Sequence, residues 1–147
     1  MILVADSGST KTTWAVVETG NKTVTEGLNP LFVTDEQVHT VCHTVRKQLF
    51  ASDIPTKIYF YGAGCGNILQ QSRMQKLLEK EFSATQVTVE TDMLGACRAV
   101  SDNKATLVGI SGTGSNVCYY DGEKIAAKSV SLGYILGDEG SANYMGR

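Results

Sequence analysis

A polar turn separates two apolar segments near the start of the chain. Residues 6–12 read Asp-Ser-Gly-Ser-Thr-Lys-Thr, with apolar residues before them and Trp14 soon after. Small side chains leave the backbone N–H groups uncovered, and successive N–H groups bind anions because they are fixed donors already directed at the ligand. The turn is longer than the two residues that a simple hairpin needs. We expect it to bind an anion, although an ordinary hairpin loop explains it equally well when it is taken alone.

A second turn of the same type follows the middle of the chain. Residues 111–115 read Ser-Gly-Thr-Gly-Ser, and at an offset of 104 Ser7-Gly8 aligns with Ser111-Gly112. Both copies read as strand, hydroxyl-and-glycine turn, strand, hairpin and strand. A repeated unit of this kind predicts two similar lobes that face each other, each offering one loop. We therefore expect a phosphate or nucleotide to bind between residues 7–12 and 112–115.

Two charged residues of the first turn suit a nucleotide. Asp6 provides the negative charge that a phosphate-bound Mg²⁺ needs, usually through a water molecule, because Mg²⁺ gives up its hydration shell reluctantly. Lys11 adds a mobile positive charge near the phosphates. The spacing of a Walker A loop occurs nowhere in the chain, and no helix is predicted directly after Thr12.

Asp92 is the candidate for acid–base chemistry. It follows the alternating strand 86–91 and precedes an apolar-periodic helix that starts at Met93. A helix N-terminus keeps a carboxylate ionised, as a general base must be, although the same effect weakens it as a base. Orienting a substrate hydroxyl is then its larger contribution. A plain helix cap is the alternative role.

Three further segments have both a structural and a functional interpretation. Residues 136–142 place Asp138 and Glu139 between glycines, as a ligand site or an acidic turn would. Asn29-Pro30 either ends a strand or contacts a ligand. For the glycines of residues 62–66 we favour close packing of a strand-to-helix turn over direct contact with a ligand.

The order of predicted elements indicates an α/β fold. Three short strands come first, then a helix from the capping box at Thr34 to about Ala51, and then strands and helices alternate. The strands are residues 1–6, 12–18, 22–27, 57–62 and 86–91, and later helices follow residues 62–66 and start at Asp92. This order predicts a mixed five-stranded sheet with flanking helices. Strands over 105–110, 116–120 and 124–130 then open a second lobe.

Composition excludes several classes of protein. The chain has 147 residues, 42% of them hydrophobic, and a formal net charge of -2, with no basic cluster for nucleic acid or an anionic membrane. No apolar run approaches the length of a membrane span or a signal peptide, so we expect a cytoplasmic protein. The four cysteines, Cys42, Cys65, Cys97 and Cys118, form no C-x-x-C pair, and we expect buried, reduced thiols.

Taken in order, the motifs resemble a known group. They are residues 6–12, Asn29-Pro30, Thr91-Asp92, residues 109–116 (Gly-Ile-Ser-Gly-Thr-Gly-Ser-Asn) and residues 136–142 (Leu-Gly-Asp-Glu-Gly-Ser-Ala). This series resembles the N-acetylglucosamine kinase branch of the BadF/BadG/BcrA/BcrD ATPases, within the superfamily of sugar kinases, actin and heat-shock ATPase domains. The resemblance implies two ribonuclease H-like (actin-like ATPase) lobes, with ATP and a sugar in the cleft between them.

The resemblance also implies individual roles. Thr10 and Thr113 would be the hydroxyl contacts to ATP, Asp6 would organise Mg²⁺, and Asp92 would be the catalytic base. The nucleotide-binding set would be Ser7, Gly8, Ser9, Thr10, Lys11, Thr12, Gly112, Thr113 and Gly114, and the sugar-binding set Asn29, Asp92, Ser115, Asn116 and Asp138. The implied reaction is in-line transfer of the γ-phosphoryl group of ATP to a hydroxyl of an amino sugar, with N-acetylglucosamine the first candidate.

Two departures from the group leave questions open. Leu132 stands where the animal enzymes carry a tryptophan ahead of the acidic motif, so the identity of the sugar stays open. The chain also ends at Arg147, within a segment predicted to be helical, whereas the group continues for a similar length. We expect a first lobe over residues 1–104 and the start of a second over 105–147, as part of a longer protein or an incomplete record of one. The number of subunits, including a homodimer, also stays open.

Two other functions compete with the kinase. An activator ATPase of the 2-hydroxyacyl-CoA dehydratase or benzoyl-CoA reductase systems would carry a G-G-Q-D type second motif and paired cluster cysteines, whereas residues 111–116 differ and the cysteines lack such spacing. A non-catalytic sensor of ATP or sugar is the other alternative, because clefts of this kind also act as switches. Sugar-dependent release of ADP would separate the kinase from both.

Overall fold

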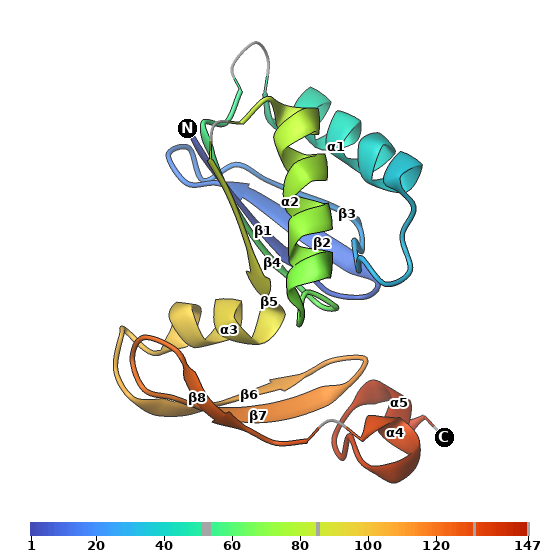
Figure 1. The fold of residues 1–147 in the computed structure, drawn as a ribbon, viewed down its shortest axis with the longest axis vertical. Coiled ribbons are helices and arrows are strands. Elements are labelled where there is room, and N and C mark those ends of the chain that lie inside the picture. The colour runs from blue at the N-terminus through green and yellow to red at the C-terminus, as the bar shows by residue number, and fades with distance from the viewer. Residues whose placement is uncertain (51–53, 85, 131, 147) are drawn as a thin grey trace. The chain divides into compact units, whose positions relative to one another are not determined.

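The structure is a computed structural model that describes residues 1–50, 54–84, 86–130 and 132–146 (Figure 1). The chain divides into two compact units, Met1–Asp92 and Met93–Arg147, and each is described by itself. This division comes earlier than the boundary at residue 104 that we expected from the sequence. The reason is that the helix after Asp92 packs its apolar face on the sheet of the second unit.

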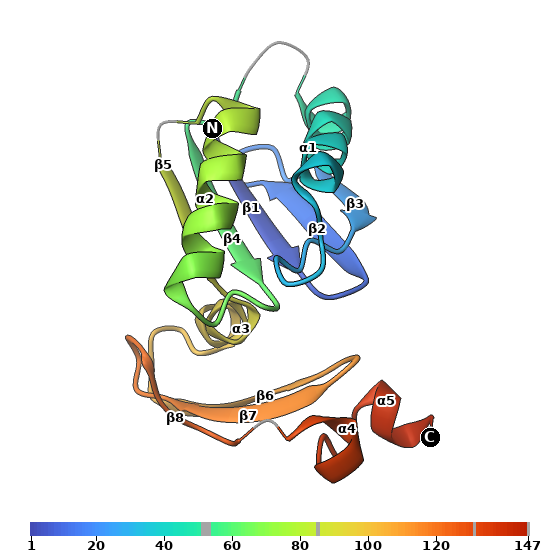
Figure 2. The same cartoon turned by 45° about the vertical axis from the view of Figure 1, so that its right-hand side comes forward.

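The first unit is built on the mixed five-stranded sheet that the sequence predicts (Figure 2). The strand order is β3-β2-β1-β4-β5, with antiparallel pairing among the first three and parallel pairing of β1 with β4 and of β4 with β5. The strands are β1 (Ile2–Ser7), β2 (Lys11–Val16), β3 (Lys22–Glu26), β4 (Lys57–Gly62) and β5 (Gln86–Thr91). Three parallel strands therefore end at the same edge of the sheet, which the site described below uses.

Two helices, α1 (Asp35–Leu49) and α2 (Ile68–Phe82), lie side by side over one face of this sheet. The predicted capping box at the start of α1 is confirmed: Thr34 Oγ1 accepts from Gln37 N at 3.2 Å, and Gln37 Oε1 accepts from Thr34 N at 2.8 Å. Asn67 caps α2 by accepting from Gln70 N at 3.0 Å. The predicted end of the first helix near Ala51 lies outside the described residues.

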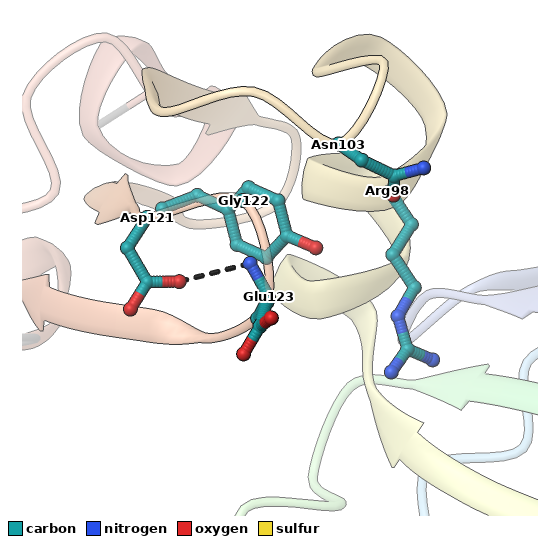
Figure 3. Close-up of a pocket in the computed structure, with 6 residues that line it drawn as sticks. Arg98, Asn103, Asp121, Gly122 and Glu123 are labelled. Carbon is teal, nitrogen blue, oxygen red and sulfur yellow. Dashed lines mark hydrogen bonds between the residues drawn. The ribbon is translucent and has the colours of Figure 1, made fainter.

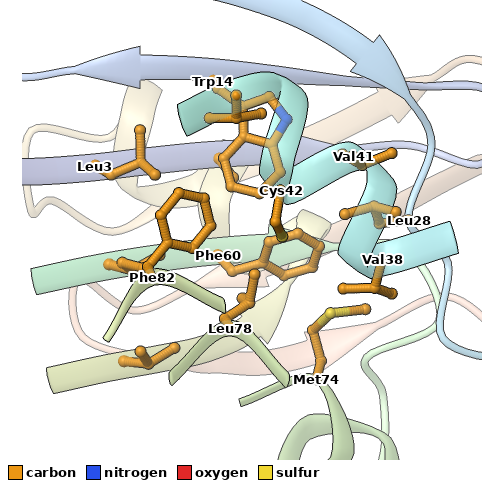
Figure 4. Close-up of a cluster of buried hydrophobic side chains, with 14 of the residues drawn as sticks. Leu3, Trp14, Leu28, Val38, Val41, Cys42, Phe60, Met74, Leu78 and Phe82 are labelled. Carbon is orange, nitrogen blue, oxygen red and sulfur yellow. The ribbon is translucent and has the colours of Figure 1, made fainter. Parts of the chain in front are cut away.

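A single apolar core joins the two helices to the sheet (Figure 4). Trp14 of β2 lies at its centre, with ring centroids 6.1 Å from Phe60 of β4 and 6.0 Å from Phe82 of α2. Phe50 extends this group, because its ring centroid lies 6.5 Å from that of Phe82. The tilted and edge-on ring geometries are those that aromatic quadrupoles favour. This packing fixes the strands β1, β4 and β5, whose ends carry the candidate site residues described below.

We expect Trp14→Ala to lower the free energy of unfolding by about 3–5 kcal/mol, because it removes a fully buried indole and leaves a cavity. The indole N–H also donates to Thr25 Oγ1 at 2.9 Å, and that bond would be lost. Urea-induced unfolding of the full-length protein measures the change. Val17→Ala is the control, because Val17 is 58% exposed and should alter stability by less than about 0.5 kcal/mol. Equal losses in the two variants would place Trp14 outside the core.

The second unit begins with a repeat of the first. Strands β6 (Thr106–Ser111) and β7 (Ser115–Tyr120) start 104 residues after β1 and β2, at 106 against 2 and 115 against 11, and β8 (Ile125–Lys128) follows by a hairpin. The repeat that the sequence predicts is therefore confirmed at the level of strands. The sheet order is β6-β7-β8, and both pairings are antiparallel.

Helix α3 (Asp92–Val100) supplies the core of the second unit. Its residues Met93 and Cys97 pack with Val108, Cys118 and Tyr120 of the sheet. The other face of β6 and β7 carries exposed apolar side chains, among which Leu107 is 73% exposed. Helix α3 thus covers one face of this sheet, and the other face carries exposed apolar side chains.

Two short helices follow β8, namely α4 (Gly133–Leu136) and α5 (Ala142–Met145). The sequence did not predict α4. It did predict a helix after the acidic segment, but one still in progress at the end of the chain. In the structure α5 ends at Met145, where the N–H of Gly146 donates to Ala142 O at 3.0 Å, and Arg147 lies outside the described residues.

The four cysteines are free and buried, as the sequence predicts. Burial raises the pKa of the Cys42 thiol to about 12 and that of Cys97 to about 11. The structure adds a contact that spacing did not reveal, a thiol–thiol hydrogen bond of 3.4 Å between Cys97 and Cys118. Across the described part of the chain, no helix combines the length and apolar character that crossing a membrane requires.

Candidate functional site

The parallel strands of the first unit bring its candidate residues to one edge. Ser7 of β1 is paired with Gly62 of β4, and Gly62 with Thr91 of β5, so the three strands end in register. The ladder continues one step further, because the N–H of Ala63 donates to Ser7 O at 2.8 Å. The segments that follow, namely the first turn, the loop after β4 and Asp92, therefore all begin at this edge. Carboxyl ends of parallel strands are where α/β sheets place their ligands.

Two buried hydroxyl groups hold the first turn in place by hydrogen bonds. Ser7 and Thr12 are fully buried, and their hydroxyl oxygens lie 2.8 Å apart. Thr12 Oγ1 donates to Glu26 O at 3.0 Å, and Ser7 Oγ accepts from Leu28 N at 3.0 Å. Both residues belong to the predicted nucleotide-binding set. In the structure their side chains hold the turn against β3 and the segment after it, so we assign them to shaping the loop.

The tip of the turn is open to solvent. Ser9, Thr10 and Lys11 are exposed and Gly8 is half-buried, so small polar residues line an accessible loop that has a rigid base. The turn is closed by a hydrogen bond of 2.9 Å from Gly8 N to Lys11 O. This arrangement offers hydroxyl groups and one mobile ammonium group to an anion.

Asp6 lies on β1 just before the turn, on the face opposite to Ser7, and its side chain is exposed. Among the described residues no group of three or more His, Cys, Asp or Glu side chains is arranged to hold a metal ion. A single accessible carboxylate beside this turn fits Mg²⁺ if the turn binds phosphate, because Mg²⁺ in kinase sites keeps several waters and is bound by one or two carboxylates together with the phosphates of the substrate. The donor set therefore suits a metal that arrives with a nucleotide.

Gly27 supports the first turn from behind, a role that the sequence did not reveal. A Cβ atom at this position would lie 2.5 Å from Gly8 O and 2.6 Å from the carbonyl carbon of Ser9. These are backbone atoms, which cannot rotate away as a side chain would. The only hint in the sequence is that Gly27 shortly precedes Asn29-Pro30. Glycine is required here because the turn passes so closely over it.

Asn29 comes from the segment that follows β3. It is 7% exposed, and its Oδ1 accepts from Leu31 N at 3.0 Å. The loop after β4 packs directly against it, because a Cβ atom at Gly64 would overlap the Asn29 carboxamide. Close packing, the interpretation that we favoured for residues 62–66, is confirmed at Gly64 and at Gly62, whose Cβ would lie 2.5 Å from the Phe60 ring.

Asp92 is half-buried and begins α3 at the end of β5. Its carboxylate influences the neighbouring loop, because burial, with a smaller contribution from the charge of Asp92, raises the pKa of the Cys65 thiol to about 12. Cys65 is thus held protonated near a carboxylate. The roles of Asp92 as a helix cap or as a base stay predictions, but its place at the edge is the one that the sequence predicts.

In the second unit, the second turn is joined to the acidic segment. Ser111 Oγ donates to Gly140 O at 2.8 Å, and the N–H of Ala142 donates to Gly112 O at 2.8 Å. Asp138 Oδ2 would lie 3.3 Å from a Cβ atom at Gly114. The second turn (residues 111–115) and the acidic segment (residues 136–142) therefore form one loop cluster.

The predicted sugar-binding residues of this unit have defined partners. Ser115 Oγ donates to Glu139 O at 2.9 Å, and Asn116 Oδ1 accepts from Ser129 Oγ at 2.9 Å. Asp138 has a left-handed backbone, with φ of 61°, in the turn that precedes α5. Ser115 thus joins the two parts of the loop cluster, whereas Asn116 is bonded to the segment after β8. The contacts of Ser115, Asn116 and Asp138 to a sugar stay predictions.

A shallow hollow elsewhere in the second unit is lined by Arg98, Asn103, Asp121 and Glu123, together with Tyr120 and Gly122 (Figure 3). The Asp121 carboxylate accepts from Glu123 N at 2.9 Å and from Lys124 N at 2.8 Å. These bonds, that to Lys124 first, lower the pKa of Asp121 and close the predicted hairpin turn at Asp121-Gly122. None of the predicted site residues lines this hollow.

No family model matches the chain, and no curated protein matches it. Among solved structures, it is similar to the "Putative N-acetylglucosamine Kinase" of Porphyromonas gingivalis, with 38% sequence identity and a TM-score of 0.86 over 96% of this chain and 52% of that protein. The chain has the actin-like ATPase fold.

More distant structures share the actin-like ATPase fold. A "Putative N-acetylglucosamine Kinase" of Chromobacterium violaceum is 15% identical, with a TM-score of 0.67 over 95% of this chain and 52% of that one. A non-polymerising mutant of MamK bound to AMPPNP is 13% identical, with a TM-score of 0.61 over 90% of this chain and 54% of that one. The chain spans about half the length of each of these structures.

Proposed function

We propose that the protein is an ATP-dependent kinase that transfers the γ-phosphoryl group to a hydroxyl of an amino sugar, with N-acetylglucosamine as the first candidate. The observation that carries this proposal is the register of β1, β4 and β5, which brings an accessible hydroxyl-and-glycine loop and Asp92 to one sheet edge. The similarity to the P. gingivalis protein supports the choice of sugar.

Asp92 acts on the sugar in this proposal. Its carboxylate accepts a hydrogen bond from the attacking hydroxyl, orients the oxygen for in-line attack and takes its proton as the bond to phosphorus forms. Asn29 binds a second polar group of the sugar. It suits this task because its Oδ1 already accepts from the Leu31 N–H, so the side chain is held in one orientation before the sugar arrives.

The first turn acts on ATP. The hydroxyl of Thr10 and the ammonium of Lys11 contact phosphate oxygens, and the buried Ser7–Thr12 pair keeps the turn in one shape. Asp6 would hold Mg²⁺ through water. When bound, the ion neutralises charge that develops on the transferred phosphoryl group. Catalysis then consists mainly of positioning and of charge stabilisation.

The loop cluster of the second unit offers polar groups of its own to a phosphate and to a sugar. Thr113 and the neighbouring glycines bind phosphate, and Asp138 binds a sugar hydroxyl, with Ser115 supporting the cluster. This part of the proposal is supported by the hydrogen bonds that join the second turn to the acidic segment.

Release of ADP by the full-length protein tests the proposal, measured with Mg²⁺ and ATP in the presence and absence of N-acetylglucosamine. We expect release to depend on the sugar and to be weaker with glucose, which lacks the acetamido group. Sugar-independent hydrolysis together with an iron–sulfur chromophore would favour the activator ATPase. Binding of ATP or sugar without turnover would favour a sensor.

We expect Gly27→Ala to raise the KM for ATP at least about tenfold. The groups of the first turn would no longer meet the phosphates, and a displacement of about an ångström weakens such an interaction out of proportion to the distance. The added methyl group would displace the backbone of Gly8 and Ser9. The KM for the sugar should change little. Gly66→Ala is the matched control, since a Cβ atom there meets nothing within 4 Å. An unchanged KM for ATP in a variant that melts like the parent would remove the first turn from the nucleotide site.

A further inference from the structure

Asn29 is held by three hydrogen bonds within its own segment, two to its backbone carbonyl and one to its side chain. The segment folds back on itself, because Asn29 O accepts from Phe32 N at 3.0 Å and from Val33 N at 3.1 Å. Asn29 Oδ1 accepts from Leu31 N at 3.0 Å, which fixes the carboxamide with its oxygen toward the turn.

Gly64 supplies the surface against which this carboxamide rests. It has a left-handed backbone, with φ of 81°, and a Cβ atom there would overlap Asn29 Oδ1 and lie 2.8 Å from Asn29 Cγ. Any other residue at this position must therefore move the Asn29 side chain as well as adopt a strained backbone. The contact joins the loop after β4 to the segment after β3 at the same edge of the sheet.

Arg73 of α2 holds the same segment from the helical layer. Its guanidinium donates to Pro30 O at 2.7 Å and to Val33 O at 2.9 Å, and it also pairs with Asp35 Oδ1 at 2.6 Å. A guanidinium presents several donors in a rigid fork, so one side chain binds both carbonyl groups at once. The segment that carries Asn29 is thereby tied to a helix of the core rather than left as a free loop.

We infer that Gly64 and Arg73 are positioning residues that fix the Asn29 carboxamide for the sugar. The inference rests on the proposed function, and it assigns to this chain a sugar subsite whose geometry is set by a glycine and a guanidinium that do not touch the sugar. Gly64 sets the position of the amide and Arg73 sets the position of the backbone that carries it. The contacts given above for Gly64 and Arg73 are with the segment that carries Asn29, whereas Gly27 supports the first turn.

Kinetics of the full-length protein separate this role from general destabilisation. We expect Gly64→Ala to raise the KM for N-acetylglucosamine about tenfold and to leave the KM for ATP within about twofold, because only the sugar-binding group is displaced. Two controls are matched to it. Gly66→Ala adds a methyl group to the same loop without a contact, and Gly20→Ala adds one at a φ of 72° with nothing within 4 Å. Neither control should change the KM for the sugar.

A double variant tests whether Gly64 acts through Asn29. In the Asn29→Ala background the overlap disappears, so adding Gly64→Ala should raise the KM for the sugar by less than about twofold more. Arg73→Gln should also raise this KM, while Arg73→Lys, which keeps the charge but loses the fork, should recover it only in part. Additive effects of Gly64→Ala and Asn29→Ala would overturn the inference.

The side-chain amide signal of Asn29, measured by ¹⁵N NMR of the full-length protein and assigned by its loss in Asn29→Ala, tests the geometry without turnover. We expect Gly64→Ala and Arg73→Gln to shift this signal and Gly66→Ala to leave it in place. A signal that stays in place in both variants would overturn the inference, and if Gly64→Ala does not fold, Arg73→Gln decides alone. A signal that shifts in a protein that does not phosphorylate sugars would support the positioning of Asn29 and count against the proposed function.

Discussion

Asp92→Asn should slow phosphoryl transfer by the full-length protein about 10²–10⁴-fold, the usual contribution of a positioned general base. The carboxylate lies at the carboxyl edge shared by β1, β4 and β5, where α3 begins. Asparagine caps helices about as well as aspartate, so the fold and the melting temperature should be retained. ATP binding should persist, because the variant does not alter the first turn. Sugar-dependent ADP release, measured beside thermal melting, gives the result.

Asp102→Asn is the matched control for this variant. Asp102 is exposed, and its φ of 54° is one that asparagine adopts readily, so its rate and stability should equal those of the parent. If Asp92→Asn melts and turns over like the parent, Asp92 is no more than a structural residue. The proposed reaction would then need another base.

Asp6→Asn should lower turnover at least about 10²-fold, because a charge that organises a metal ion contributes several kcal/mol to the transition state. The side chain is exposed at the end of β1, on the face opposite to the buried Ser7, so the fold should tolerate the change. Turnover is measured across a titration of Mg²⁺. The variant should need more Mg²⁺ for half-maximal rate, and an unchanged rate at saturating Mg²⁺ would contradict the role that we give to Asp6.

The sequence was sufficient for the sheet and for the repeat because both depend on local patterns. Apolar alternation predicted the strands, and Thr34 with Gln37 predicted the start of α1, where the structure shows both capping bonds. The repeated turn predicted strands that do start 104 residues apart, at 2 and 106. Patterns of this kind survive folding because the residues that form them are neighbours along the chain.

What the sequence could not show depends on contacts between distant segments. Nothing near Gly27 indicates that the backbone of Gly8 and Ser9 lies against it. Likewise, nothing near Arg73 in the sequence indicates that its guanidinium binds two carbonyl groups of the segment after Asn29. These roles arise from the tertiary fold, which side-chain type and spacing do not encode directly.

Two residues of the predicted nucleotide-binding set also make contacts that the sequence analysis did not predict. Ser7 and Thr12 match a phosphate loop by residue type, but their hydroxyl groups bond to each other, to β3 and to the segment after β3. Alternation in β1 and β2 would have predicted their burial, since Ala5 and Trp14 on the same faces are also buried. The side chains of Ser7 and Thr12 therefore shape the turn, and a contact of these residues with a nucleotide stays a prediction.

Mass spectrometry of N-acetylglucosamine after incubation with the full-length protein, Mg²⁺ and ATP tests the central claim most directly, because it distinguishes transfer from hydrolysis. The account predicts a phosphorylated sugar formed in amounts equal to ADP, and loss of both products in Asp92→Asn. Formation of ADP and inorganic phosphate at the same rate with and without sugar, with the sugar unmodified, would contradict it.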